Sequence, residues 1–159
     1  MPDSLHFVSA AAWQGVTHMK PLNFKSSKLK VIPYEDNEIN PGILGRTLSE
    51  WITDQLKGSK YEVSEVIEED FGYCLMVKRK PYWLWVGCSG FSEHEYPEDG
   101  LSEEIAENFP IETIEWSVWV TTEMGWLSKI LGKDNRKAEA MELESILRDK
   151  LNEIKAETI

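Results

Sequence analysis

Two adjacent apolar runs constrain the fold of this chain more than any other feature. Phe71–Lys78 and Tyr82–Cys88 have the composition of strands, and Arg79-Lys80-Pro81 between them is typical of a turn. The apolar residues of both runs, CLMV and YWLWV, stand at consecutive positions. Because successive side chains of a strand point to opposite faces, such strands need cover on both faces. We therefore predict a hairpin at the centre of a sheet.

Three further segments are predicted to be strands. Leu29–Tyr34 alternates in part, and Pro33 has no N–H to donate to a ladder, so this strand is placed near an edge. Tyr61–Ile67 precedes the hairpin. Ile114–Thr122 alternates strictly, with an apolar face and a second face that includes Trp119. The expected sheet is antiparallel and has about five strands.

Two long amphipathic helices are predicted. The first follows Asn40, which can cap a helix with Pro41 in its first turn, and ends at Gly58. Its apolar residues recur at helical spacing: Leu44, Leu48, Trp51, Ile52 and Leu56. The second follows a cap at Asp134 and has a similar stripe: Leu143, Ile146, Leu147, Leu151 and Ile154. An α+β two-layer sandwich, with both helices on one face of the antiparallel sheet, would bury both stripes.

The chain is expected to form one domain over residues 1–159, because this length can bury a core of its own. Within it, residues 1–27 are treated as an N-terminal extension and residues 89–113 as an acidic insert. Leu101, Ile105 and Phe109 stand four residues apart and predict a two-turn helix within the insert. Gly125–Leu131 is expected to form a short amphipathic turn of helix.

The negative charge is concentrated in one part of the chain. Residues 81–128 contain ten carboxylates and no Lys or Arg, whereas the other 111 residues contain 18 acids and 17 bases. The same stretch holds five of the seven tryptophans. A field of one sign beside aromatic side chains can steer and then anchor a basic partner. Nucleic acid and anionic membrane surfaces are disfavoured as partners, since binding phosphate requires clustered cations.

The sequence also lacks the features of a membrane or secreted protein. No apolar run approaches the ~20 residues that a membrane span requires. The apolar patch Phe7–Trp13 has no basic region ahead of it, although Ala10-Ala11-Ala12 leaves a cleavable signal as the alternative. Two cysteines do not make a disulfide framework. A cytoplasmic protein is expected.

Each group that might carry chemistry has a simpler structural explanation. Cys88 and His94 are the residue types of a nucleophile and its base, but Cys88 opens the most acidic part of the chain, where a thiolate is disfavoured. Cys74 and Cys88 are equidistant from the turn and should face each other on the hairpin as buried, reduced thiols. The pair Glu69 and Asp70 might serve as acid and base, but a turn between strands uses the same residues.

No motif predicts a metal ion or a cofactor. Glu93-His94-Glu95, with Glu98 and Asp99, has oxygen and nitrogen ligands but not the spacing of a zinc or calcium site. Solvated loop acids explain this cluster. The phosphate loop, the dinucleotide fingerprint and the hydrolase elbow are absent. Accordingly, we assign no catalytic residue, metal or cofactor.

Two segments carry a resemblance to known proteins. Gly45–Trp51 (GRTLSEW) and Glu69–Cys88 (EDFGYCLMVKRKPYWLWVGC) resemble the core of a family of small bacterial proteins without an assigned function. The likeness covers about Lys30 to Gly90 and, more loosely, Ile114 to the end. By size, charge and surface, small acidic α+β proteins of this kind are similar to the immunity proteins that neutralise antibacterial toxins. This second likeness rests on no motif, and it implies that specificity lies in the acidic insert.

The leading hypothesis is a non-enzymatic protein-binding module, an immunity protein that occludes a basic toxin domain. Its predicted contact residues are Glu93, Glu95, Glu98, Asp99, Glu103, Glu104, Glu107 and Trp119. The alternative is a small-molecule-binding protein or enzyme with a Trp-lined pocket, using Cys88 or the Glu69–Asp70 pair. A structural or oligomerisation role is the third hypothesis. Trp83 and Trp85 share one face of their strand, either toward the helices or on the exposed side.

Overall fold

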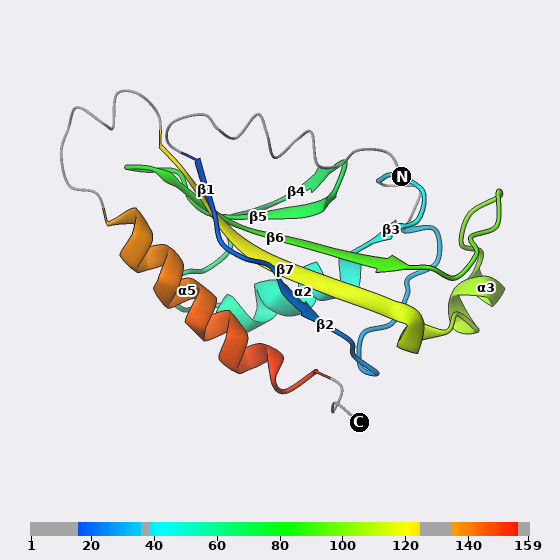
Figure 1. Ribbon diagram of the computed structural model, residues 1–159. Helices are drawn as coiled ribbons and strands as arrows, with labels where there is room; N and C mark the ends of the chain where they lie inside the picture. Colours follow the sequence, from blue (N-terminus) through cyan, green and yellow to red (C-terminus); the bar gives the residue numbers. More distant parts are fainter. Residues whose placement is uncertain (1–15, 36–38, 125–134, 156–159) are drawn as a thin grey trace.

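The computed structural model describes residues 16–35, 39–124 and 135–155, which form an α+β fold (Figure 1). The helices of this part are α2 (Arg46–Leu56), α3 (Glu103–Glu107), α5 (Arg136–Leu151) and the 3-10 helix η3 (Ile111–Thr113). The strands are β1 (Val16–His18), β2 (Leu22–Phe24), β3 (Ile43–Leu44), β4 (Glu65–Glu69), β5 (Gly72–Lys78), β6 (Trp83–Ser92) and β7 (Ile114–Glu123). Among the described residues, no helix is both long and apolar enough to cross a membrane.

The strands form one antiparallel sheet in the order β1-β7-β6-β5-β4. Strands β6 and β7 have ten residues each and pair along their whole length, from Trp83 opposite Glu123 to Ser92 opposite Ile114. Strand β2 also pairs with β7, and β3 also pairs with β6, so seven strands occupy five positions across the sheet. The predicted α+β class, the antiparallel sheet and the β5–β6 hairpin are confirmed.

One face of the sheet shares a core with α2 and α5, which lie on the same side in Figure 1. The helices contribute Leu48, Ile52, Leu56, Leu143, Leu147 and Leu151, and the sheet contributes Leu75, Leu84, Val86, Cys88, Trp116, Val118 and Val120. Burying a large apolar side chain is worth about 1.5–3 kcal/mol, so this core is the main source of stability. The predicted alternation of β7 and the spacing in both helices are therefore explained by one buried face.

The opposite face of the sheet carries a smaller aromatic cluster. Cys74, Met76 and Trp85 are buried there, and Ile67, Phe71 and Trp119 pack against them. Trp83 and Trp85 alternate along β6 with Leu84 and Val86, which belong to the core beneath the helices. The tryptophan pair therefore faces away from α2 and α5.

The predicted strand Leu29–Tyr34 is wrong, since these residues form no ladder. Leu29 and Val31 are buried, which accounts for the apolar pattern. Tyr34 has a φ of 61°, in the left-handed region, so the extended backbone cannot continue through it. The other upstream strand begins later than predicted, because β4 spans Glu65–Glu69 rather than Tyr61–Ile67.

Helix α2 also begins later than the sequence predicts. Ile43 and Leu44 pair with β6 as strand β3, and the helix starts only at Arg46. Asn40 does not cap it, because its side chain donates to the Asp70 carbonyl oxygen over 2.9 Å. The cap comes from Glu35, a fully buried carboxylate that accepts hydrogen bonds from the backbone of Gly45 and Arg46.

The two ends of the chain also differ in part from expectation. Strands β1 and β2 lie within residues 1–27, so residues 16–24 of the predicted N-terminal extension belong to the sheet. The predicted helical turn Gly125–Leu131 and the cap Asp134 lie outside the described residues. In helix α5, Glu144 and Arg148 form an ion pair one turn apart.

Candidate functional site

The acidic insert is a folded connection at one end of the sheet. Residues 89–92 of the predicted insert instead continue β6; the remainder leaves the end of β6, forms the short helix α3 and returns to β7 through η3 (Figure 1). The Oγ atoms of Ser92 and Thr113 lie 2.5 Å apart and join its two ends. Ser102 caps α3 by accepting a hydrogen bond from the Ile105 amide. The contact between Ser92 and Thr113 fixes the insert where it leaves and rejoins the sheet, and the contact of Ser102 fixes the start of α3.

Apolar side chains attach the insert to the main core. Leu101, Ala106 and Phe109 are buried and belong to the cluster beneath the helices. The rings of His94 and Tyr96 lie 5.4 and 5.5 Å from the ring of Phe109. Helix α3 has five residues and is shorter than the predicted two-turn helix, so it contains Ile105, whereas Leu101 and Phe109 lie on either side of it. The insert therefore presents its charges from a fixed base.

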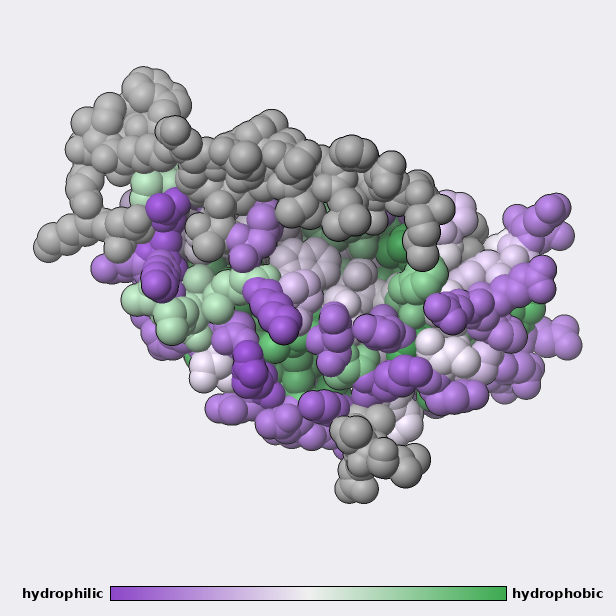
Figure 2. All heavy atoms as spheres, viewed as in Figure 1, coloured by the Kyte–Doolittle hydropathy of each residue, from purple (hydrophilic) through white to green (hydrophobic). Residues whose placement is uncertain are grey.

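The structure brings seven of the eight predicted contact residues to this end of the molecule, all of them exposed carboxylates. We call them the acidic surface: Glu93, Glu95, Glu98, Asp99, Glu103, Glu104 and Glu107. Figure 2 shows hydrophilic side chains around α3 and the adjoining loop. Among the described residues, no Lys or Arg forms an ion pair with any of the seven. The negative field is therefore not neutralised from within this part of the chain.

Trp119, the eighth predicted contact residue, lies elsewhere. It is half-buried on the aromatic face of the sheet, with its ring 5.4 Å from that of Phe71. Its indole ring lies over Gly87, where an added Cβ would be only 2.2 Å from the ring. Gly87 is five residues before the end of β6, roughly 16 Å along the strand at about 3.3 Å per residue. Trp119 and the acidic surface therefore belong to separate regions.

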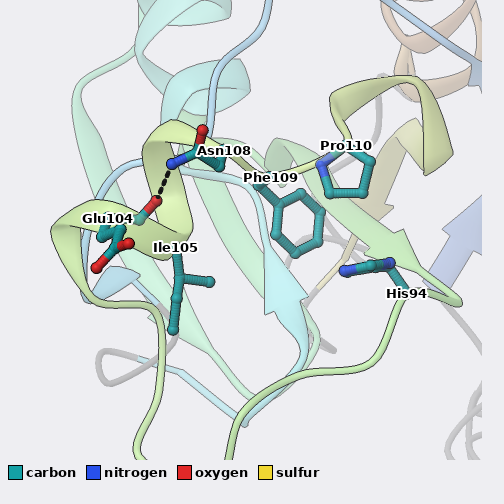
Figure 3. Close-up of a pocket in the computed structure, with 6 residues that line it drawn as sticks. All are labelled: His94, Glu104, Ile105, Asn108, Phe109 and Pro110. Carbon is teal, nitrogen blue, oxygen red and sulfur yellow. Dashed lines mark hydrogen bonds between the residues drawn. The ribbon is translucent and has the colours of Figure 1, made fainter.

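A hollow at the acidic insert was not predicted from the sequence. We call it the α3 hollow; its volume is about 510 Å³ and it is lined by His94, Glu104, Ile105, Asn108, Phe109 and Pro110 (Figure 3). Asn108 donates its side-chain N–H to the Glu104 carbonyl oxygen over 2.8 Å. The spacing of Ile105 and Phe109 was the available signal, but it could not place His94 beside them.

The groups proposed for an enzyme are arranged differently. Cys74 lies opposite Gly87 rather than Cys88, because a bulge between Met76 and Lys78 shifts the register. The two buried free thiols therefore point to opposite faces of the sheet. Burial raises the pKa of the Cys88 thiol, and burial with nearby carboxylates raises that of Cys74 to about 12. Both thiols are protonated at neutral pH and lack the electropositive setting of a nucleophile.

The structure also gives the positions of the predicted carboxylate pair and of the candidate metal ligands. Glu69 and Asp70 are exposed at the β4–β5 turn. Neither they nor any tryptophan line the α3 hollow. Within the described ranges, no three His, Cys, Asp or Glu side chains form a group that could hold a metal ion.

Comparisons with models of protein families, with curated proteins and with solved structures find no match for this chain.

Proposed function

We propose that this protein is a non-enzymatic binding protein that recognises a basic protein through its acidic surface, and that it acts as an immunity protein against a toxin. One observation carries the proposal. Seven carboxylates project from an insert held by buried residues, and no described Lys or Arg pairs with any of them. The toxin as the partner is an expectation from size, charge and surface, and a cytoplasmic location is an expectation from the features of the sequence.

The physical argument concerns the cost of concentrating like charges. Carboxylates gathered on one segment repel one another and lower stability, and neutral residues would avoid that cost. The same field attracts a basic surface and can raise the association rate by about 10- to 1,000-fold. A fixed acidic surface can thus reach and cover a cationic active site without any catalytic group of its own.

The rest of the fold supplies the support that such a surface needs. We infer that α2 and α5 form the second layer of a two-layer sandwich, since both share a core with one face of the sheet. Leu101 and Phe109 connect the insert to that core. A prearranged surface loses less conformational entropy on binding than a flexible loop would.

The first test changes the charge of the acidic surface and measures association. A partner would be captured from a lysate of the source organism, and its association rate measured against ionic strength. The variant Glu103→Lys, Glu104→Lys and Glu107→Lys should slow association at low salt by about tenfold or more and flatten its salt dependence. The melting temperature should change little, because all three side chains are exposed.

A matched control separates the acidic surface from net charge. Replacing Glu62, Glu68 and Asp149 by Lys gives the same change in net charge at exposed positions outside the insert. This control should slow association less than the insert variant does. If both variants have the same effect, or neither has any, the acidic surface is not the interface. The aromatic face around Trp119 would then be the next surface to test.

A second test addresses the toxin directly. A toxin reading frame immediately upstream of this gene would identify a specific partner for co-expression. The wild-type chain should restore growth to cells that express this toxin, and the insert variant should restore it less. Equal rescue by both would remove the acidic surface from the neutralising interaction.

A further inference from the structure

The α3 hollow combines two kinds of environment within the acidic insert. Ile105, Phe109 and Pro110 form an apolar part that is buried or half-buried. His94 lies across from them, with its ring perpendicular to that of Phe109 at 84° and 5.4 Å (Figure 3). Of the seven carboxylates of the acidic surface, Glu104 lines the hollow beside this apolar part. A ligand that fits both environments needs an apolar stem and a cationic head.

We propose that the α3 hollow is an anchor site for an arginine side chain of the basic partner; this inference rests on the function proposed above. Long basic side chains lay their methylene stems on apolar surface while the charged head stays in water. The hollow offers Ile105 and Pro110 to the stem and the Glu104 carboxylate to the head. Charge complementarity excludes an acidic occupant, and the solvent-exposed carboxylates favour a cationic one over a neutral one.

Arginine fits this geometry better than lysine. The guanidinium is planar, is more weakly hydrated than an ammonium group and stacks on aromatic rings. The exposed imidazole of His94 supplies such a surface on one side of the hollow, whereas the ring of Phe109 is buried. Arginine also pairs with a carboxylate through two parallel N–H donors, which a lysine cannot do.

Two glutamates of α3 provide a matched comparison. Glu104 lines the hollow, whereas Glu107 is on the same short helix and does not. Both are exposed, and neither forms an ion pair with a described residue. In Figure 3 the Glu104 carboxylate lies at the α3 end of the hollow, on the side away from His94. Replacing either residue by Gln changes the net charge equally but changes the hollow only at Glu104.

The probe is a capped tripeptide, acetyl-Gly-Arg-Gly-amide, titrated into the full chain at low salt and followed by amide chemical shifts. The amides of His94, Ile105 and Phe109 should shift most. The Lys tripeptide should bind more weakly, and the tripeptide with citrulline, which has nearly the shape of arginine without its charge, weakest of the three. Glu104→Gln should weaken binding of the Arg tripeptide by about twofold to fivefold, and Glu107→Gln by less.

Each alternative result has a definite meaning. Equal affinities for the Arg and Lys tripeptides would overturn the arginine assignment, and tight binding of the citrulline tripeptide would overturn the cationic site. Equal weakening by Glu104→Gln and Glu107→Gln would overturn the hollow as the anchor. Both side chains are exposed, so both variants should fold, and their amide spectra would check this.

The proposed function and this inference fail in different ways. If the Lys substitutions at positions 103, 104 and 107 leave association of the protein partner unchanged, the acidic surface itself is not used. If those substitutions slow association but the two Gln variants behave alike, the acidic surface stands and only the anchor is wrong.

Discussion

Glu35 should hold the start of helix α2 in place, and removing its carboxylate should cost much of the stability of the protein. The side chain is fully buried and accepts hydrogen bonds from the backbone amides of Ile32, Gly45 and Arg46, at 2.9, 3.3 and 3.2 Å. The last two amides belong to the N-terminus of α2. A carboxylate there satisfies donors that have no partner within the helix and interacts favourably with the helix dipole.

The expected loss can be estimated from these contacts. Losing a helix cap costs about 0.5–2 kcal/mol. Leaving the Ile32 amide without an acceptor costs about 1–3 kcal/mol more. Burying a charge is itself costly, so removing it offsets part of these losses. We therefore expect Glu35→Ala to lower the free energy of unfolding by about 3 kcal/mol. Glu35→Gln should lose less stability than Glu35→Ala, because its amide oxygen can still accept a hydrogen bond. It should remain less stable than wild type, because its NH₂ group turns donors toward backbone donors.

The measurement is urea unfolding followed by circular dichroism, with the slope of free energy against urea as a check on two-state behaviour. Glu50→Ala is the control, because Glu50 is an exposed residue of the same helix that pairs with Arg46 over 3.4 Å. It should cost less than about 1 kcal/mol. A loss below about 1 kcal/mol for Glu35→Ala would refute the role of this carboxylate as the cap.

Two further predictions concern stability. Burial raises the pKa of the Glu139 carboxyl, but its hydrogen bonds from the Lys78 ammonium outweigh burial and lower the pKa overall. Glu139→Gln should therefore cost about 2 kcal/mol at neutral pH. The difference in free energy of unfolding between wild type and Glu139→Gln should shrink as the pH falls from the ordinary Glu pKa of about 4.3 toward the lowered pKa of Glu139. Urea unfolding at several pH values would measure it, with Asp149→Asn as the control. A difference that does not depend on pH would contradict this prediction. Gly87→Ala should cost about 1–3 kcal/mol, because the new Cβ meets the Trp119 ring. Combining it with Trp119→Ala should relieve that clash, and strict additivity would count against it.

Local patterns in the sequence were sufficient to predict the centre of the fold. The alternation of Ile114, Trp116, Val118 and Val120 describes one buried face of β7. The apolar residues of the β5–β6 hairpin describe strands buried on both faces. These patterns depend only on the period of a strand, so they can be read without knowing what the strand packs against.

Features that depend on contacts between residues far apart in the sequence could not be predicted from local patterns. The pairing of Ile43 with Phe91 converts what reads as a first helical turn into β3, and the true cap comes from Glu35. The bulge between Met76 and Lys78 shifts the register by one residue, so counting from the turn misplaced Cys74. In each case a tertiary contact overrides the local signal.

The candidate site was predictable in its charge but not in its shape. The sequence contains seven carboxylates between Ser92 and Phe109 with no Lys or Arg among them, which was enough to nominate this segment. It could not show that Trp119 lies on the separate aromatic face, beside Phe71. Nor could it show that His94 turns toward Phe109 to form one side of a hollow.

The position of the acidic surface explains how the fold tolerates it. The carboxylates are exposed at the end of the sheet, where water and salt screen their repulsion. Beneath them, Leu101 and Phe109 are buried in the main core, and their burial opposes the tendency of like charges to spread the insert apart. Screening by salt weakens that repulsion and also weakens attraction to a basic partner. The charge that costs stability is therefore the same charge that steers binding, and the apolar anchors of the insert allow it to remain concentrated in one place.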